Sequence, residues 1–465
     1  MTRDRKPAPD EGFMLRSRAP TYAPVPRGTP LPGGTPTDKS PGPDFDWDVI
    51  DPRRYTSREF MELEWQKIWT KVWLLGGRAC DIPEPGDYLV TEIGPESILI
   101  VRQKDGTVRA FYNVCQHRGN RLRDCGIGTA EESLTFKCRY HHWEYNLDGS
   151  YHRIPDIDTF PQGKPRHALT EVGCEIWAGF IWYTMNENPP PLRQYLEPLV
   201  EHLEPYRFEK MIQTRNITVE WDCNWKTSVD AFNETYHVQG IHPQLLWYLH
   251  DLDVQIDCYE RHNRYLIPFG LLSPRVRVPP TIPDPIKVLM KAANMDPAEY
   301  EGRIADIRQD VQRHMRAGAA SKGKDYSQLN DDQLTDDYHY MIFPNLSLNV
   351  HADDFWVFRQ RPHASDPDKM YYDIWTFEIE QNLSELDDPD EIRPRVRHQH
   401  FRHGDKSIGL VLDQDAENLP GVQLGMHSRG FKGLWIGRQE TRIRHFHKVI
   451  DDYIYGPGKK PPGAL

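Results

Sequence analysis

The sequence predicts an α+β protein, in which a small antiparallel β domain precedes a larger domain with an antiparallel sheet and a helical insert. Strand-like alternation occurs in two stretches far apart in the chain, 85–114 and 341–379, and therefore predicts two separate sheets. The charged stretch at 280–335 has apolar residues in partial helical period, which indicates a helical insert. We expect an arm, a first domain with a leading helix, a second domain containing the insert, and a C-terminal tail, at 1–45, 46–170, 171–450 and 451–465.

The first 45 residues hold ten prolines among glycines and mixed charges. Such a segment buries too little surface to fold alone, so we expect an arm that is disordered or laid across a neighbouring subunit. From Ser57 to Trp73 apolar residues recur at helical spacing, with Ser57 as the N-cap. This pattern predicts an amphipathic helix that leads into the first domain.

The first domain is predicted to be an antiparallel sheet. Runs at 88–93 and 97–102 are rich in β-branched residues, and Asp105–Gly106 supplies a hairpin turn before 108–114. In the second domain, 217–221 is a predicted strand that leads into a helix. The runs 341–351, 354–361 and 370–379 alternate like strands with one buried face.

Two cysteine–histidine pairs follow the first strands. They are Cys115 with His117, and Cys138 with His141. Two cysteines and two histidines could hold zinc, but zinc motifs usually pair cysteine with cysteine and histidine with histidine. One thiolate and one imidazole from each half suit a Rieske [2Fe-2S] cluster, in which two cysteines hold one iron and two histidines the other.

A second cluster of metal-binding side chains lies in the segment 225–242. Asp230, Glu234 and His237 recur at spacings of four and three, so on a helix their side chains share one face. A glycine and a proline within 240–243 interrupt the helix and are expected to let His242 turn back towards that face. Two histidines with a carboxylate suit a mononuclear ferrous iron with open coordination positions for dioxygen.

Together these motifs resemble the catalytic alpha subunit of the Rieske non-haem iron oxygenases, also called aromatic-ring-hydroxylating oxygenases. The resemblance covers roughly residues 45 to 450, in the family's order. It implies that the second domain has a helix-grip-like fold, with the sheet roofed by the helix that carries His237. The sequence departs from the common family pattern at Gln116, Arg139 and His142, which leaves cluster assembly intact but affects its potential and partner docking.

The resemblance also implies a third iron ligand near the C-terminus. The family places this carboxylate eight residues before a glutamine that corresponds to Gln423, which selects Asp415. Asp413 and Glu417 remain competitors, because acidic residues at the start of a helix are favoured by the helix dipole without any metal.

Other residues have expected supporting roles. Trp143 and Tyr140 shield the cluster, and Asp230 orients the iron histidines from outside the ligand set. Glu234 bridges His237 to the cluster histidine His141 of a neighbouring chain. The candidates for substrate binding are Ala231, Leu246, Trp247, Phe343, Asn345 and Ser347.

The resemblance implies the partners as well. Electrons come from NADH or NADPH through a separate ferredoxin or flavin reductase, since the chain has no glycine-rich dinucleotide loop of its own. Within one subunit the two metal sites are expected to lie too far apart for fast electron transfer. A head-to-tail homotrimer, with or without a small beta subunit, brings them together.

Composition excludes several classes of function. The formal net charge of −12 disfavours a nucleic-acid partner, and no apolar run reaches the length of a membrane span, about 20 residues. Seven cysteines without a signal peptide indicate reduced thiols in a bacterial cytoplasm.

The reaction class implied is mono- or dioxygenation with O2 as co-substrate. Our first expectation for the substrate is an aromatic or alicyclic carboxylate or hydrocarbon, as in aromatic hydrocarbon catabolism. The alternative is oxidation of a quaternary ammonium compound, or oxidative demethylation, because family members that act on quaternary amines often carry glutamate at the position of Glu234. A Rieske electron carrier without catalysis is disfavoured by the second iron site.

Overall fold

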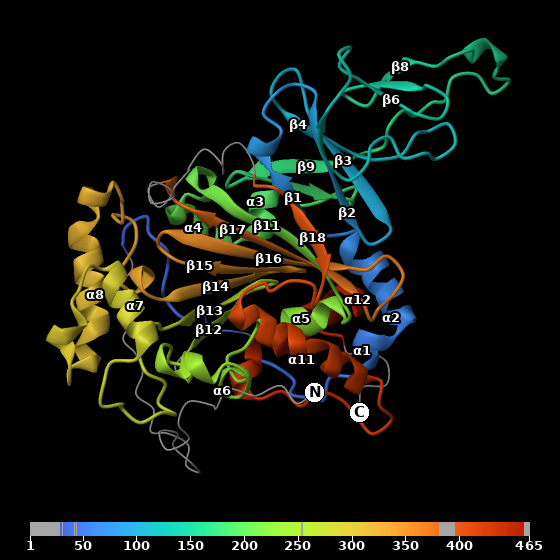
Figure 1. The fold of residues 1–465 in the computed structure, drawn as a ribbon. Coiled ribbons are helices and arrows are strands. Elements are labelled where there is room, and N and C mark those ends of the chain that lie inside the picture. Colours follow the sequence, from blue (N-terminus) through green and yellow to red (C-terminus); the bar gives the residue numbers. More distant parts are fainter. Residues whose placement is uncertain are drawn as a thin grey trace.

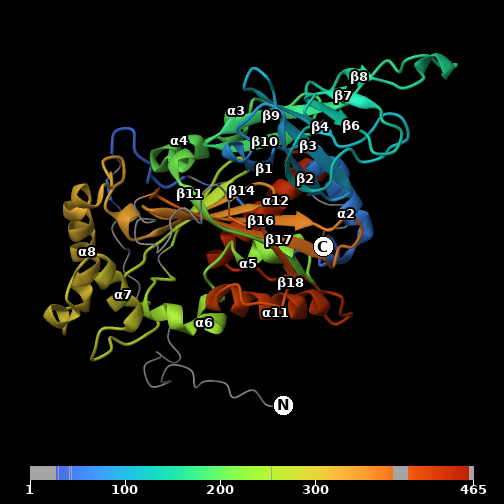
Figure 2. The same ribbon diagram turned by 45° about the horizontal axis from the view of Figure 1, so that its top comes forward.

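Two large β-sheets are packed one on the other in the computed structural model, which describes residues 28–29, 31–40, 42, 44–252, 254–380 and 396–459 (Figure 1). The predicted α+β class is confirmed. A three-stranded finger extends from the first sheet, and helices cover the outer face of the second (Figure 2).

The first sheet has seven strands. In spatial order they are β1 (Leu74–Arg78), β10 (Phe180–Thr184), β9 (Glu171–Trp177), β4 (Val108–Tyr112), β3 (Glu96–Arg102), β2 (Asp87–Ile93) and β5 (Gly126–Thr129). The finger consists of β6 (Thr135–Lys137), β7 (Glu144–Asn146) and β8 (Tyr151–Arg153). Strands β9 and β10 carry this sheet beyond residue 170, where the sequence had suggested its end.

Helical structure forms within the predicted range Ser57–Trp73. Helix α2 (Arg58–Glu64) continues into a π-helical turn at Trp65–Trp69, and a short helix that was not predicted, α1 (Arg53–Thr56), precedes Ser57. The Ser57 hydroxyl accepts a hydrogen bond from the backbone N–H of Phe60, which confirms its role as the N-cap.

The second sheet has eight strands. They are β12 (Gln255–Cys258), β13 (Asn263–Ile267), β14 (Asp337–Ile342), β15 (Leu346–Val350), β16 (Asp354–Pro362), β17 (Met370–Glu378), β11 (Ile212–Trp221) and β18 (Gln399–Arg402). All neighbouring pairs are antiparallel except β11 and β18, which are parallel. The predicted run 341–351 is not one strand. It is a hairpin that turns at 343–345, because Pro344 lacks the N–H that a continuous ladder requires.

The helices have the following bounds: α3 (Leu192–Leu196), α4 (Leu199–Leu203), α5 (Trp225–Ala231), α6 (Val238–Ile241), α7 (Asp284–Ala292), α8 (Ile304–Gly318), α11 (Leu410–Met426) and α12 (Thr441–Tyr455). Short 3-10 turns lie at Ala79–Asp81, Ile157–Thr159, Glu204–Tyr206, Phe208–Lys210, Pro243–Trp247, Pro297–Tyr300, Ala320–Lys322, Asp332–Leu334 and Arg438–Glu440. Helices α7 and α8 form the predicted insert at one edge of the molecule (Figure 1).

The two faces of the second sheet have different neighbours. On one face Phe358 packs against Phe232 at the end of α5, with ring centroids 4.9 Å apart. On the other face Arg359 and Arg361 donate to the backbone carbonyls of Leu75 and Glu92 in the first domain. The sheet is therefore a middle layer between the helices and the first domain.

The described part of the arm packs against its own chain. Thr35 donates to the carbonyl of His202, and the backbone N–H of Ser40 donates to Asp257. Arg264 donates to the carbonyl of Pro36. The expectation of an arm that is disordered or laid across a neighbour is wrong for these residues, and residues 1–27 lie outside the described part.

None of the seven cysteines forms a disulfide in the structure. None of the described helices combines the length and the apolar character that a membrane span requires.

Candidate metal centres

Three side chains predicted to hold iron meet at one point between α6 and α11. The ligand atoms of His237, His242 and Asp415 lie within 4.8 Å of one another, and no other group of three or more such side chains occurs among the described residues. Asp415 Oδ1 is 3.0 Å from Nε2 of His242 and 3.7 Å from Nε2 of His237. Ligands about 2.1 Å from a shared ion lie about 3 Å apart, so the spacing fits one metal ion.

Hydrogen bonds orient both imidazoles towards Asp415. His237 Nδ1 lies 2.5 Å from Glu234 Oε1, and His242 Nδ1 lies 2.9 Å from the side-chain oxygen of Gln414. Because each Nδ1 faces an oxygen acceptor, it carries the ring proton, and each Nε2 is left with a free lone pair for a metal. Gln414 was not singled out in the sequence, although it adjoins Asp415.

The predicted continuous helix through Asp230, Glu234 and His237 is wrong. Helix α5 ends at Ala231 and α6 begins only at Val238. The Glu234 carboxylate accepts from the backbone N–H of His237 at 2.9 Å, and such a side-chain bond replaces a helical one. A break that was not predicted therefore comes before His237. The predicted interruption at 240–243 is also present, because α6 ends at Ile241 and the backbone of His242 is not helical.

Asp230 consequently faces a different set of partners. Its carboxylate accepts from the Tyr55 hydroxyl at 2.5 Å and lies 3.4 Å from His447 Nε2. All three residues are buried. Asp230 thus ties the helix that precedes the iron histidines to α1 and α12, and it has no hydrogen bond to His237 among the bonds of the described chain.

The charges around His237 favour its protonated form in the absence of a metal. Burial opposes protonation, but the hydrogen bond to Glu234 and the negative charges of Glu234 and Asp415 outweigh it and raise the pKa of His237. A divalent ion at the same point would be stabilised by the same carboxylates.

The competitors of Asp415 have other positions. Asp413 accepts from the backbone N–H of Ile408 at 2.8 Å and from the Ser407 hydroxyl, so it stabilises the start of α11. Glu417 is exposed. Neither belongs to the group of converging ligand atoms.

The two cysteine–histidine pairs face each other at the end of the first domain. Cys115 and Cys138 are buried, whereas His117 and His141 are half-buried with ring centroids 4.4 Å apart. His117 Nδ1 is buried without a hydrogen-bond partner in the described chain. Two buried thiols beside two imidazoles fit a two-iron cluster, in which two cysteines hold one iron and two histidines the other.

Polar groups surround the two sulfurs. The Tyr145 hydroxyl lies 3.3 Å from Cys115 Sγ, and Asn120 Nδ2 lies 3.7 Å from Cys138 Sγ. Such contacts tune the potential of an iron–sulfur cluster. Trp143 stacks on His117 as a shield, with centroids 4.8 Å apart, whereas Tyr140 is 57% exposed and covers only the His141 ring.

The six residues suggested for substrate binding separate into two groups. Phe343 stacks on Tyr453, and Asn345 donates to the carbonyl of Gln360, so both make contacts of the core. The others are Ala231 at the end of α5, Leu246 and Trp247 in the turn after His242, and Ser347 on the sheet face that carries Phe358.

Aromatic side chains that sequence reasoning missed line the same face. Phe232, Phe358 and Tyr372 have centroids 4.9 to 5.9 Å apart. Burial raises the pKa of Tyr372, and the charge of Asp415 adds to this rise, which indicates that the ring lies near the iron site. Phe358 and Tyr372 lie more than 100 positions from the iron-binding segment in the sequence, whereas Phe232 adjoins Ala231 and was not singled out.

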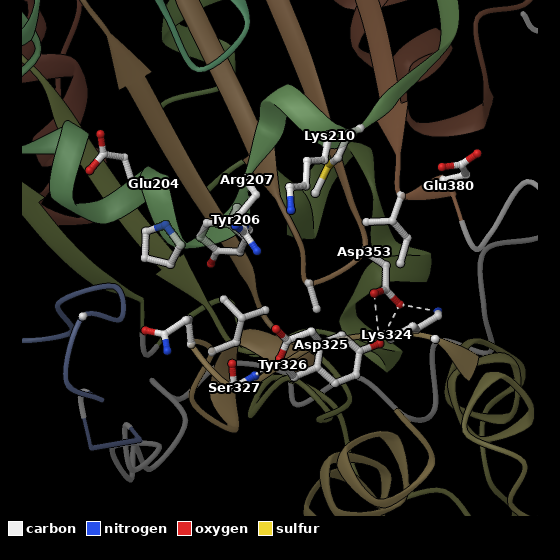
Figure 3. Close-up of a pocket in the computed structure, with 18 residues that line it drawn as sticks. Glu204, Tyr206, Arg207, Lys210, Lys324, Asp325, Tyr326, Ser327, Asp353 and Glu380 are labelled. Carbon is white, nitrogen blue, oxygen red and sulfur yellow. Dashed lines mark hydrogen bonds and ion pairs between the residues drawn. The ribbon is translucent and has the colours of Figure 1, made fainter. Parts of the chain in front are cut away.

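A cavity of about 630 Å³ lies elsewhere, between the 204–211 segment, the 323–329 loop and the turn after β15 (Figure 3). Lys324 and the Tyr326 hydroxyl both bind Asp353 there. None of the candidate site residues lines it.

Comparison with known proteins agrees with this architecture. Residues 208–456 match the catalytic domain of the ring-hydroxylating alpha subunit, and residues 72–164 match the Rieske [2Fe-2S] domain. The chain belongs to the alpha subunits of the Rieske non-haem iron oxygenases.

Several curated relatives share about a third of the aligned residues. The glycine betaine monooxygenase oxygenase subunit of Pseudomonas aeruginosa is 33% identical over 192 residues, 41% of this chain and 44% of that protein. The carnitine monooxygenase oxygenase subunit of Acinetobacter baumannii is 30% identical over 258 residues, 54% and 67% of the two chains. The benzene 1,2-dioxygenase alpha subunit of Pseudomonas putida is 31% identical over 195 residues, 40% of this chain and 43% of that protein. The chain thus spans less than half the length of the glycine betaine relatives it matches.

Solved structures share the fold. The quaternary ammonium Rieske monooxygenase CntA with L-carnitine has a TM-score of 0.63 and 21% identity, covering 91% of this chain and 99% of that chain. Naphthalene 1,2-dioxygenase with indole has a TM-score of 0.61 and 18% identity, covering 88% and 93%.

Proposed function

We propose that this chain is the terminal oxygenase component of a system that oxidises a quaternary ammonium compound. The observation that carries the proposal is the convergence of His237, His242 and Asp415, with Glu234 bound to the outer nitrogen of His237. Iron bound there supplies dioxygen chemistry. The identities to glycine betaine and carnitine monooxygenase subunits support this substrate class over the aromatic one expected first from the sequence.

The aromatic side chains near the iron site also support a cationic substrate. Quaternary ammonium groups are attracted to the faces of aromatic rings, and Phe232, Phe358 and Tyr372 form a cluster on the face of the sheet beside α5. The cluster would contribute dispersion and electrostatic attraction without a fixed counter-charge. It would equally exclude water from the reacting bond.

The proposed reaction inserts one oxygen atom into a C–H bond next to the quaternary nitrogen. It balances as R3N⁺–CHR′H + O2 + 2e⁻ + 2H⁺ → R3N⁺–CHR′(OH) + H2O. The hydroxylated product then loses a proton and its C–N bond breaks, which gives R3N, an aldehyde R′CHO and H⁺. The two electrons come from NADH or NADPH through a reductase.

Electron supply requires a second copy of the chain in this proposal. The finger with Cys138 and His141 lies at the opposite end of the subunit from α6 and α11 (Figures 1 and 2). Tyr236 beside the iron site is 53% exposed, and Tyr140 beside His141 is 57% exposed. A head-to-tail trimer would bury both and place His141 of one copy against Glu234 of the next.

A substrate panel tests the proposal. Purified enzyme with a surrogate reductase and NADH is given glycine betaine, carnitine, choline, benzene and benzoate, and oxygen uptake is measured together with aldehyde and tertiary amine. We expect substrate-dependent oxygen uptake with equimolar amine and aldehyde from at least one quaternary compound. A dihydrodiol from benzene or benzoate, with no reaction of the ammonium compounds, would support the aromatic alternative, to which the benzene dioxygenase relative points.

A further inference from the structure

His339 presents a hydrogen-bond donor that the chain does not use. Its ring stacks on Tyr265 with centroids 4.7 Å apart and planes 13° apart, and the residue is 1% exposed. Arg442 donates to His339 Nδ1 at 3.1 Å. Since Arg442 can only donate, Nδ1 accepts and the ring proton lies on Nε2. His339 Nε2 is buried with no hydrogen-bond partner among the described residues.

Arg442 is a buried cation held entirely by neutral groups. Its side chain is fully buried, donates to the side-chain oxygen of Asn263 at 2.6 Å and lies 4.0 Å from the centre of the Tyr265 ring. A longer contact of 3.5 Å joins it to the carbonyl of Phe232. No carboxylate of the described chain forms an ion pair with it within 4.0 Å.

The charge of Arg442 therefore lacks a nearby counter-charge, and burial lowers its pKa to about 9. Asp337 acts on Arg442 at longer range, but its own burial raises the Asp337 pKa to about 7. A buried charge is stabilised when an anion joins it. An anionic oxygen next to His339 would supply that anion.

These groups lie beside the candidate iron site. Phe232 ends α5 two positions before Glu234, and its carbonyl also accepts from the Tyr265 hydroxyl at 3.2 Å. Burial raises the pKa of Tyr265, and the charges of Glu234 and Asp415 contribute to the rise. Tyr265 thus links the His339–Arg442 pair to the iron-binding segment.

We propose that His339 Nε2–H, polarised by Arg442 behind the ring, binds a carboxylate of the substrate, so that the enzyme prefers zwitterionic quaternary amines over purely cationic ones. The inference rests on the proposed function and refines its substrate class. The aromatic cluster on the same sheet face receives the ammonium group, and His339 fixes the other end of the molecule. His339 is then a specificity-determining residue that leaves the reacting atoms untouched.

The first test uses the unchanged enzyme. Dissociation constants are measured by calorimetry on the oxidised holoenzyme without reductant, for glycine betaine and carnitine and for the methyl ester of each. Esterification keeps the ammonium group and removes the carboxylate charge. We expect each ester to bind at least about tenfold more weakly than its acid, because the ester cannot form the charge-assisted hydrogen bond to His339.

The second test changes the donor. His339→Leu removes it, His339→Gln keeps an N–H at the end of the side chain, and His445→Gln is a matched control. His445 is also fully buried beside Asn263, but both of its ring nitrogens have partners, Asn263 and the carbonyl of Tyr259. We expect His339→Leu to weaken binding of the acids about tenfold and of choline by less than about twofold. His339→Gln should still bind the acids more tightly than His339→Leu does. His445→Gln should leave the ratio of the dissociation constants for the acids and choline unchanged.

The outcomes separate this inference from the function on which it rests. Equal affinity of acid and ester, or oxidation of choline but of neither acid, overturns the carboxylate site and leaves quaternary ammonium oxidation standing. Absence of turnover with every quaternary compound overturns the proposed function itself. Should His339→Leu not fold, the comparison of acid with ester still decides the inference.

Discussion

Asp415 supplies the only carboxylate among the three converging ligand atoms, at 3.0 Å from His242 Nε2. Replacing it by alanine leaves two neutral imidazoles, which hold Fe(II) poorly. We expect Asp415→Ala to lose nearly all mononuclear iron, measured by metal analysis, while its Rieske visible spectrum stays intact. Asp413→Ala is the control, since Asp413 binds only the start of α11. Full iron occupancy in Asp415→Ala would show that the ligand lies elsewhere.

Glu234 holds His237 through a hydrogen bond of 2.5 Å and is 9% exposed at its side chain. In Glu234→Gln the amide keeps the shape but removes the negative charge between the two centres. We predict that this variant retains both metals and its oligomeric state and loses at least about 90% of turnover. Losing one residue that hydrogen-bonds to a metal ligand typically lowers activity about 10- to 100-fold. Stopped-flow oxidation of the reduced cluster checks it. Wild-type single-turnover rates would contradict the bridging role.

The three side chains of the candidate iron site could be predicted from the sequence and its family resemblance, and the residues around them could not. Residue type and spacing selected His237 and His242, and the family resemblance selected Asp415 among three acidic candidates. The structure brings these three side chains together. Asp230 was assigned to the wrong partner because the helix break before His237 depends on a side-chain bond of Glu234. The proposed donor role of His339 depends on its contact with Arg442, which lies 103 positions away in the chain. A local sequence pattern cannot predict such a contact.

At the scale of elements, a buried ion pair joins the leading helix to the helix before the iron ligands. Lys226 Nζ on α5 lies 2.7 Å from Glu64 Oε1 on α2, and their side chains are 0% and 2% exposed. Glu64→Gln leaves the buried lysine unpaired, which typically costs roughly 3–5 kcal/mol. We expect a clear fall in the melting temperature by calorimetry. The double variant Glu64→Leu with Lys226→Met should be less destabilised than Glu64→Gln, and a larger loss in the double variant would argue against this explanation.

The turn between β15 and β16 provides a pH-dependent contribution to stability. His351 Nδ1 lies 2.9 Å from Asp354 Oδ1. Burial opposes protonation of His351, but Asp354 and Asp337 raise its pKa from 6.5 to about 9. A raised histidine pKa stabilises the fold fully below about pH 6.5, and this contribution is lost as pH rises through about 9.

The wild-type melting temperature should therefore fall by a few degrees between pH 6.5 and 9.5 relative to His351→Asn. His314→Asn, at an exposed position on α8, should follow the wild-type curve. Parallel curves for wild type and His351→Asn would contradict the assignment.

Elements with a regular period were predicted well, and their interruptions were not. The strands at 87–93 and 96–102 and the helices of the insert lie where the sequence suggested. The hairpin of β14 and β15 turns inside the predicted run 341–351, and it was missed because the alternation of apolar residues does not mark the turn. The long connection that returns β9 and β10 to the first sheet depends on pairing with β4 and β1, which a single sequence does not specify.

At the scale of the whole molecule, the distance between the two candidate centres governs the mechanism. The finger with His141 and the helices around Asp415 lie at opposite ends of the subunit (Figure 2). In the proposed arrangement a neighbouring copy of the chain supplies the cluster that serves each iron. In this arrangement the Rieske domain of one copy contacts the catalytic domain of the next. The contact would bury the exposed Tyr140 and Tyr236 and would place Glu234 between the two centres.

A single-turnover experiment tests the central claim most directly. The enzyme is reduced anaerobically, freed of reductant, loaded with glycine betaine or carnitine, and mixed with oxygenated buffer. Visible absorbance follows the cluster, and quenched samples are assayed for aldehyde and tertiary amine. We predict that a quaternary substrate accelerates oxidation of the cluster and that product forms in proportion to the cluster oxidised. Protein that contains zinc and no sulfide, or a cluster that oxidises at the same rate without substrate and yields no product, would contradict the account.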